Sequence, residues 1–285
     1  MFGTFFLMYT MKTTTAIQGI KGSFHHVVAM DYFPQEIELL ECLSFDSLVD
    51  TILNGEAKQA VMALENSIAG SIIPNYALID QNDLSIVGEY NLTIHHNLMA
   101  LAGQSIEDIK EVHSHPMALL QCKEFFRAYP HIRLIEAADT ADVARSISED
   151  GQKGIGAIAP KQAAVIYNLD ILAHSIQTIQ DNVTRFVIIQ KNSNAIEKKQ
   201  INKASLKFIL DHQRGSLAAV LNVMSDCLLN LTKIQSLPVI ETPGKYAFFV
   251  DVTFDRFQQY EKARKILEIM ALEFKILGEY TTAKK

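Results

Sequence analysis

The sequence has little cysteine. Cys42, Cys122 and Cys227 are the only three among its 285 residues. An odd number of cysteines at such wide spacing suits neither a disulfide framework nor a zinc motif. We therefore expect reduced, mostly buried thiols and no structural metal.

Clusters of lysine and arginine are absent as well, and the formal net charge is -6. The chain therefore lacks the basic surface with which proteins bind nucleic acid or anionic membranes. It also lacks a run of about 20 apolar residues, the length that a membrane span needs. We expect no nucleic-acid or membrane partner. An anionic ligand would have to be bound by helix N-termini and one or two arginines.

Residues 1–14 include a short apolar run, but they have neither the basic region nor the small-residue cleavage site of a signal peptide. We interpret them as an extension in front of the first domain, with Met11 as an alternative start. The expected compartment is the cytoplasm.

The length of the chain and its apolar content of 48% predict two domains with a sizeable core. From residue 15 to 190, short apolar runs alternate with amphipathic stretches, as in α/β proteins. Strands are predicted at 15–18, 59–64, 85–90, 92–102, 132–136, 154–159 and 184–190. Helices are predicted at 47–54, 71–80 and 161–167, from Ser23 and Pro116 onward, and after Thr140, which is the expected cap of its helix.

Residues 191–203 are polar and have no periodic apolar positions, which indicates a linker. Beyond it, residues 204–285 follow the order strand, helix, strand, strand, helix, strand. This βαββαβ order is the split-βαβ pattern of ferredoxin-like domains.

Small or hydroxyl residues precede three predicted helices, in the loops Gly19-x-x-Gly22-Ser23, Glu65-Asn66-Ser67-x-x-Gly70-Ser71 and Ser114-His115-Pro116. Each loop presents N–H groups at a helix N-terminus, which suits a carboxylate. Each alone is more often only a turn with a helix cap. Together, without a metal or nucleotide motif, they indicate a cleft for a small anion.

These loops, with His96 in LTIHHNL, Thr140-Ala141 and Asn182-x-Thr184-Arg185-Phe186, resemble the ordered motif series of prephenate dehydratases. The resemblance covers residues 15–190 and continues into 204–280, which is similar to an ACT regulatory domain. It implies a catalytic domain like type II periplasmic binding proteins, with residues 15–92 and 177–190 in one lobe and 93–176 in the other. It also implies conversion of prephenate to phenylpyruvate, water and carbon dioxide without a metal or organic cofactor.

The resemblance assigns catalysis to Thr184, whose hydroxyl would donate a proton to the leaving hydroxyl. It assigns Arg185 to a substrate carboxylate as a bidentate donor. The other substrate-binding residues that it implies are Ser23, Asn66, Ser67, Gly70, Ser71, His96, Ser114, His115, Thr140 and Phe186. Without the resemblance, a threonine that starts a strand is usually only a good β-former.

The sequence departs from the family pattern in its loops. His25, Met117 and Asp139 stand where the family usually has serine, glutamine and a small hydroxyl residue. In the C-terminal domain, Gln235 and Leu237 replace a glutamate and an arginine.

The C-terminal domain also resembles the segments with which relatives bind phenylalanine between two subunits. The matching residues are Gly215, Ser216, Leu217, Asn230 and Leu231. L-phenylalanine is therefore the expected effector, and a homodimer or homotetramer the expected assembly. Because Gln235 and Leu237 cannot form the ion pair of relatives, we expect weak inhibition.

Two other functions fit the same features. An arogenate dehydratase performs the same chemistry on a substrate with an amino group in place of the keto group. A non-catalytic small-anion-binding protein can share the lobed fold.

Overall fold

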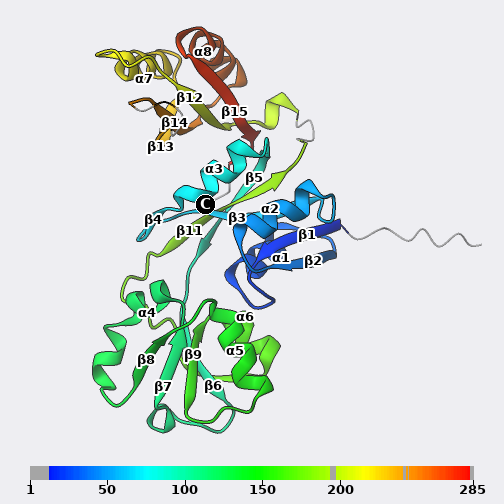
Figure 1. Cartoon of the computed structure of the whole chain (residues 1–285), viewed down its shortest axis with the longest axis vertical. Coiled ribbons are helices and arrows are strands. Elements are labelled where there is room, and N and C mark those ends of the chain that lie inside the picture. Colours follow the sequence, from blue (N-terminus) through cyan, green and yellow to red (C-terminus); the bar gives the residue numbers. More distant parts are fainter. Residues whose placement is uncertain (1–12, 193–196, 240–241, 243, 283–285) are drawn as a thin grey trace, which may run out of the picture.

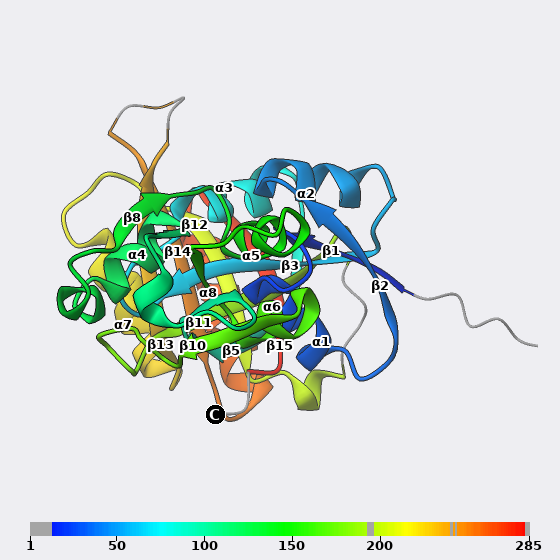
Figure 2. The ribbon, with the colours of Figure 1, turned by 90° about the horizontal axis from the view of Figure 1, so that it is seen from below.

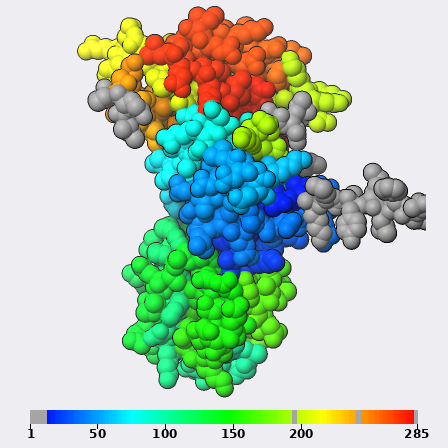
Figure 3. Space-filling model, turned by 45° about the vertical axis from the view of Figure 1, so that its right-hand side comes forward, coloured from blue at the N-terminus to red at the C-terminus, as the bar shows by residue number. Residues whose placement is uncertain are grey.

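The computed structural model describes residues 13–192, 197–239, 242 and 244–282. Three parts are stacked along its long axis: the C-terminal domain, a first lobe and a second lobe (Figures 1 and 3). The first strand begins at Thr13, so two residues of the expected extension belong to the fold. Met11 and residues 193–196 of the expected linker lie outside the described residues.

The first lobe is built on strands in the order β5-β11-β3-β1-β2. Strands β1 and β2, and β1 and β3, are parallel, whereas β11 is antiparallel to both β3 and β5. The elements are β1 (Thr13–Gln18), α1 (Phe24–Tyr32), β2 (Ile37–Cys42), α2 (Phe45–Leu53), β3 (Gln59–Asn66), β4 (Gly70–Ser71), α3 (Ile73–Gln81), β5 (Ser85–Thr93) and β11 (Val183–Gln190).

Both faces of this sheet are covered by helices, which explains the continuous apolar run in β3. Met62 and Leu64 point toward α2 and α3, where they pack with Leu48 and Ile79. Val61, on the opposite face, packs with residues of α1. Figure 2 shows α1 and α2 on opposite sides of β1 and β3.

The second lobe has a sheet of its own, in the order β10-β6-β9-β7-β8. Helices α5 and α6 pack on one face of it and α4 on the other. Its elements are β6 (Asn97–Leu101), η1 (Ile106–Asp108), β7 (Glu111–Ser114), α4 (Pro116–Cys122), η2 (Phe125–Ala128), β8 (Arg133–Glu136), α5 (Thr140–Glu149), β9 (Ile155–Ala159), α6 (Lys161–Tyr167) and β10 (Leu169–Ala173).

Two adjacent segments connect the lobes, at residues 94–96 and 176–182. The backbone N–H of Ile94 donates to the carbonyl of Asn182 at 2.7 Å, and that of Ile176 donates to the carbonyl of His96 at 2.8 Å. This paired connection is the arrangement that allows two lobes to move about a hinge.

The C-terminal domain has the predicted βαββαβ order. Its four strands are antiparallel in the order β13-β14-β12-β15, and both helices pack against one core. The elements are η3 (Lys198–Gln200), β12 (Lys203–Ile209), α7 (Ser216–Asp226), β13 (Asn230–Pro238), β14 (Tyr246–Thr253), α8 (Phe257–Met270) and β15 (Glu273–Tyr280).

The sheets of the C-terminal domain and the first lobe are joined into one of ten strands. The junction consists of β15 and β5, which pair in parallel at Gly278 and Ile86. A Cβ at position 278 would lie 2.2 Å from the Ile86 carbonyl oxygen. Glycine is therefore required for this close approach of two backbones.

Several elements differ from the sequence predictions. Ser71 belongs to the short strand β4, and the helix expected at 71–80 begins at Ile73. The strand expected at 92–102 is interrupted at 94–96, where the chain changes lobes. The cap of α5 is Asp139 and not Thr140, because the Asp139 carboxylate accepts from the first free N–H groups of the helix. Strands β2, β7 and β10 were not predicted.

Candidate active site

A cleft of about 400 Å³ lies where the two lobes face each other. Its walls come from the strand ends and helix N-termini of both lobes. The lining residues are Gln18, Ser23, Phe24, His25, Phe45, Ala63, Asn66, Ala69, Ile72, Ile94, His96, His115, Met117, Ala118, Gln121, Ala138, Asp139, Thr140, Thr184 and Phe186.

Thr184 stands near the start of β11 and is buried. Its Oγ1 accepts a hydrogen bond from Asn66 Nδ2 at 2.9 Å. The Asn66 Oδ1 in turn accepts from the N–H groups of Ile68 and Ala69, which fixes the amide. Because Asn66 occupies an acceptor site of the Thr184 hydroxyl, the hydroxyl proton remains available for a ligand in the cleft.

A chain of side-chain amides extends from Asn66 across the hinge. Asn66 Nδ2 donates to Asn182 Oδ1 at 2.7 Å, and Asn182 Nδ2 donates to Gln121 Oε1 at 2.9 Å. His96 Nε2 lies 2.8 Å from the same Gln121 oxygen. The chain joins residues of both lobes, so the position of Asn66 depends on how the lobes are arranged.

The His96 ring is neutral in this arrangement. The Gln121 oxygen can only accept, so the hydrogen is on Nε2 and the lone pair is on Nδ1. Burial lowers the pKa of His96, which favours this neutral form. The Nδ1 atom is buried and has no hydrogen-bond partner among the described residues, which leaves it free to accept from a ligand.

Another part of the wall is apolar and aromatic. The His25 ring meets Phe186 and Phe45 edge to face, with centroids 5.0 and 5.6 Å apart. Burial lowers the pKa of His25 to about 3. This histidine therefore supplies no positive charge to the cleft near neutral pH.

Asp139 is the one carboxylate of the lining, which contains neither lysine nor arginine. Its Oδ1 caps α5 by accepting from the N–H groups of Ala141 and Asp142 at 2.8 and 2.9 Å. Its Oδ2 lies beside Gly19, where a Cβ would come within 2.8 Å of that oxygen. Burial raises the pKa of Asp139, although the two N–H groups act in the opposite direction.

The structure brings many of the residues implied by the family resemblance to the cleft. They are Ser23, Asn66, His96, His115, Thr140, Thr184 and Phe186. Ser23 and His115 also cap α1 and α4, so each has a structural role beside any contact with a ligand.

Five residues of the predicted set lie outside the lining: Ser67, Gly70, Ser71, Ser114 and Arg185. Ser67 Oγ connects the loop after β3 to the start of β11, where it accepts a hydrogen bond from the N–H of Val183 at 2.9 Å. Ser71 accepts from Lys233 of the C-terminal domain, and buried Ser114 donates to the Ile158 carbonyl. Gly70 is exposed in the β3–β4 hairpin.

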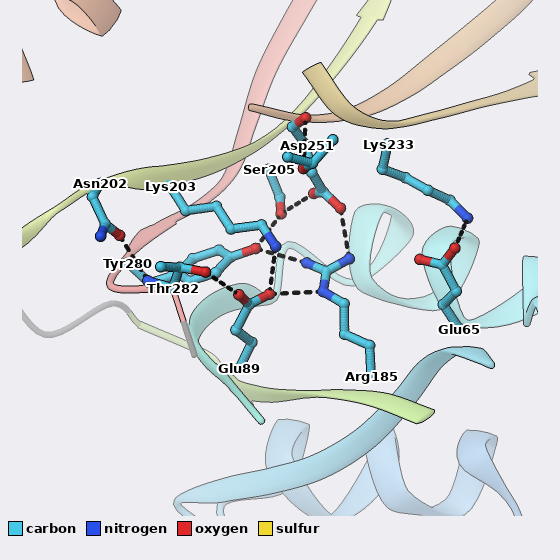
Figure 4. A network of polar contacts seen from close by, with 11 residues as sticks. Glu65, Glu89, Arg185, Asn202, Lys203, Ser205, Lys233, Asp251, Tyr280 and Thr282 are labelled. Atoms are coloured by element: carbon cyan, nitrogen blue, oxygen red, sulfur yellow. Dashed lines mark hydrogen bonds and ion pairs between the residues drawn. The ribbon is translucent and has the colours of Figure 1, made fainter. Parts of the chain in front are cut away.

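The structure does not bring Arg185, which the resemblance assigns to a substrate carboxylate, to the cleft. Successive side chains of a strand point to opposite faces, and Thr184 and Phe186 take the face of the cleft. The Arg185 guanidinium is buried beneath the C-terminal domain (Figure 4). It donates to Glu89 at 2.7 Å, to Asp251 at 2.6 Å and to the Tyr280 hydroxyl at 2.8 Å.

The sequence interpretation missed Gln121 and Asp139. Asp139 could have been found, because an aspartate directly before a helical stretch is a common cap. Gln121 carries no local signal: it reaches the cleft only through its contacts with His96 and Asn182, far away in the sequence.

Within the described parts of the chain, no helix is both long and apolar enough to span a membrane. Among the same residues, no group of three or more His, Cys, Asp or Glu side chains could hold a metal ion.

Comparison with known proteins agrees with this geometry. Residues 15–194 match the family model for prephenate dehydratase. The chain is 34% identical to arogenate dehydratase/prephenate dehydratase 2 of Arabidopsis thaliana, a chloroplastic protein, over 94% of this chain and 73% of that protein.

Two solved structures share the fold over nearly the whole chain, each with a TM-score of 0.85. Prephenate dehydratase from Arthrobacter aurescens in complex with L-Phe is 24% identical, with 94% of this chain and 90% of that chain covered. GqqA, described as a novel type of quorum quenching acylase, is 25% identical, with 95% and 98% covered. The family match extends over more than half of the sequence, and the chain therefore belongs to the prephenate dehydratase family.

Proposed function

We propose that this chain converts prephenate to phenylpyruvate, and that Thr184 acts as the proton donor. The observation that carries the proposal is the buried Thr184 hydroxyl, which Asn66 holds at the wall of the cleft. Asn66 donates to the Thr184 oxygen, so it stabilises negative charge that develops there as the proton is shared.

The reaction breaks two bonds of the substrate ring. The ring carboxylate leaves as carbon dioxide, and the electron pair of its C–C bond enters the ring. The C4–O bond breaks, and the departing hydroxide takes up a proton to leave as water. A lining without lysine or arginine holds the ring carboxylate weakly, which favours a transition state in which its charge is dispersed.

The test is turnover of prephenate by the purified full chain without added metal, followed through phenylpyruvate. Product formation at a catalytic rate is expected. A folded protein that turns over neither prephenate nor arogenate would contradict the proposal and would favour a binding protein of the same fold.

Asp139 favours arogenate as a second candidate substrate. Its Oδ2 is a carboxylate oxygen at the cleft wall, and arogenate carries an ammonium group where prephenate has a keto group. A carboxylate attracts the ammonium group of arogenate but has no comparable attraction for the neutral keto group of prephenate.

The Asp139→Asn variant keeps an oxygen for the helix cap and removes the charge. If Asp139 contacts the substrate amino group, the ratio of kcat/KM for arogenate to that for prephenate falls by about tenfold or more. An unchanged ratio would restrict Asp139 to capping α5.

Phenylalanine is the proposed effector, and two subunits are proposed to form its site. Gly215, with φ +88, precedes α7, whereas Asn230 follows α7 at the start of β13. An 11-residue helix is about 16 Å long, so these segments do not meet within one chain. A small cavity of about 110 Å³ already lies beside Ser216 and Leu217.

The proposed organisation is a catalytic domain at 15–190, a linker at 191–203 and a regulatory domain at 204–285. The second lobe and the C-terminal domain each have an apolar core of their own, which supports this division. The core of the first lobe continues into the C-terminal sheet, where it includes Ile209, Phe249 and Leu277. The proposed compartment is the cytoplasm, which the three unpaired, buried cysteines support.

A further inference from the structure

The C-terminal domain contacts the first lobe at two residues that are next in sequence to Thr184 and Asn66, the hydrogen-bonded pair of the cleft. Thr184 and Asn66 face each other across β11 and β3, and Arg185 and Glu65 form the next pair. Both Arg185 and Glu65 are bound by side chains of the C-terminal domain (Figure 4). The regulatory domain thus reaches the immediate neighbours of both Asn66 and Thr184.

The first contact is a buried ionic cluster around Arg185. Glu89 of β5 binds both Arg185 and Lys203 at 2.7 Å, while Asp251 of β14 binds Arg185 at 2.6 Å. Removal of one member would leave an uncompensated buried charge and destabilise the whole protein. A loss of activity in a variant of this cluster could therefore result from unfolding as well as from displaced active-site residues.

The second contact is partly exposed and easier to test. Lys233 Nζ, from β13, donates to Glu65 Oε1 at 2.7 Å and to Ser71 Oγ at 2.6 Å. Glu65 and Ser71 face each other across the β3–β4 hairpin, whose tip carries Asn66 and its loop. One ammonium group therefore holds both arms of this hairpin.

We propose that Lys233 is a positioning residue of the active site. By holding the hairpin it fixes the loop whose N–H groups orient Asn66, and through Asn66 it fixes the hydroxyl of Thr184. The proposal rests on the proposed function, because it requires Thr184 to act in the reaction. Lys233 lies three residues after Asn230 on β13, so it also connects the proposed effector segment with the cleft.

The test compares two lysines that join the same two domains. Lys233→Met should lower kcat by about fivefold or more and change KM by less than about twofold. Lys233→Arg should restore most of the lost activity, since arginine keeps a charged donor.

The matched control is Lys207→Met. Lys207 binds Asp80 and Glu273 and is 12% exposed, against 15% for Lys233, but it does not touch the hairpin. Lys207→Met should keep the wild-type kcat.

A double-mutant cycle tests whether Lys233 acts through Glu65. In a Glu65→Gln background, Lys233→Met should have little further effect on kcat. Independent, multiplying effects of the two substitutions would overturn the proposal, as would an equal kcat in Lys233→Met and Lys207→Met.

Hydrogen exchange provides a readout that needs no turnover. The amides of Ile68 and Ala69 donate to Asn66 Oδ1 and report on its orientation. They should exchange faster in Lys233→Met than in Lys207→Met, and equal rates would overturn the proposal. A wild-type chain without turnover of either substrate would contradict the proposed function instead, and the exchange comparison would still decide the role of Lys233.

Discussion

Thr184 is the residue on which the proposed chemistry depends most directly. Thr184→Ala is expected to reduce kcat by about 10²-fold or more, because proton donation by a positioned group typically contributes that much. Thr184→Ser keeps the hydroxyl beside Asn66 and should retain much more activity than Thr184→Ala. Steady-state rates and circular dichroism check both variants. Near-wild-type turnover in a folded Thr184→Ala protein would remove Thr184 from the mechanism.

His25 shows how burial sets the charge of a cleft residue. Its pKa is about 3 in the folded protein, whereas an exposed histidine has a pKa of about 6.5. Between these two values the unfolded chain binds a proton that the folded chain does not, so acidification favours unfolding. From pH 7.5 to 5.5 this histidine alone should cost about 1.4 kcal/mol of stability.

His25→Phe should remove that part of the acid sensitivity and keep the aromatic contacts with Phe45 and Phe186. The measurement is the free energy of unfolding by denaturant at both pH values. His26 and His96, whose pKa values are also lowered, contribute equally to both proteins and cancel in the comparison. An equal loss of stability in wild type and variant would show that His25 is protonated in the folded state.

The surroundings of Arg185 could be predicted from the sequence only in part. The Thr-Arg-Phe sequence indicated that a site lies nearby, and the alternation of strand side chains was enough to show that Thr184 and Arg185 face opposite ways. What the sequence could not show is the destination of Arg185. Glu89, Asp251 and Tyr280 come together around it only after β5, β14 and β15 have folded into one sheet.

At the level of elements, strong periodic patterns were predictable and weak ones were not. Helix α6, for example, begins and ends at the residues predicted for it, 161 and 167. Strand β7 has a single apolar residue, Val112, among its four, so it shows no apolar run or alternation that could be recognised. The partner strand at the junction of β5 and β15 could not be predicted, because the junction consists of one residue pair whose members lie far apart along the chain. Its local mark is Gly278, a glycine inside a strand.

That junction yields a prediction of its own. In Gly278→Ala the new methyl group would meet the Ile86 carbonyl oxygen at 2.2 Å and the Ile86 Cβ at 2.7 Å, so the two strands must separate. We expect a loss of roughly 1–3 kcal/mol of stability. Calorimetry should show the C-terminal domain unfolding before the catalytic lobes. A single transition at the wild-type temperature would show that β5 and β15 are not held this closely.

At the scale of the whole molecule, the C-terminal domain offers a free sheet edge for assembly. Strand β15 is paired with β5, whereas β13 has a neighbour on one side only, β14. Free edge strands are natural sites for pairing with a second copy. Antiparallel pairing of two β13 strands would place Asn230 of one copy beside Pro238 of the other. Pro238 pairs with Tyr246, which lines the cavity beside Ser216. This arrangement would bring the effector segment at Gly215–Leu217 of one copy close to Asn230 of the other copy. Within one chain the two segments lie at opposite ends of α7.

We therefore predict that Ile234→Lys, on an exposed position of β13, converts a dimer into a monomer and abolishes inhibition by phenylalanine. Ile234 is 41% exposed, and a charge there would be buried against its own copy. The control is Ile269→Lys on α8, where the side chain is 85% exposed and lies away from the free edge. It should leave both assembly and inhibition unchanged.

Light scattering gives the mass of the assembly, and steady-state rates with increasing phenylalanine give the inhibition. We expect inhibition of the wild type to stay partial, since Gln235 and Leu237 cannot form an ion pair. A wild-type monomer that phenylalanine inhibits fully would refute both the edge pairing and the two-subunit site.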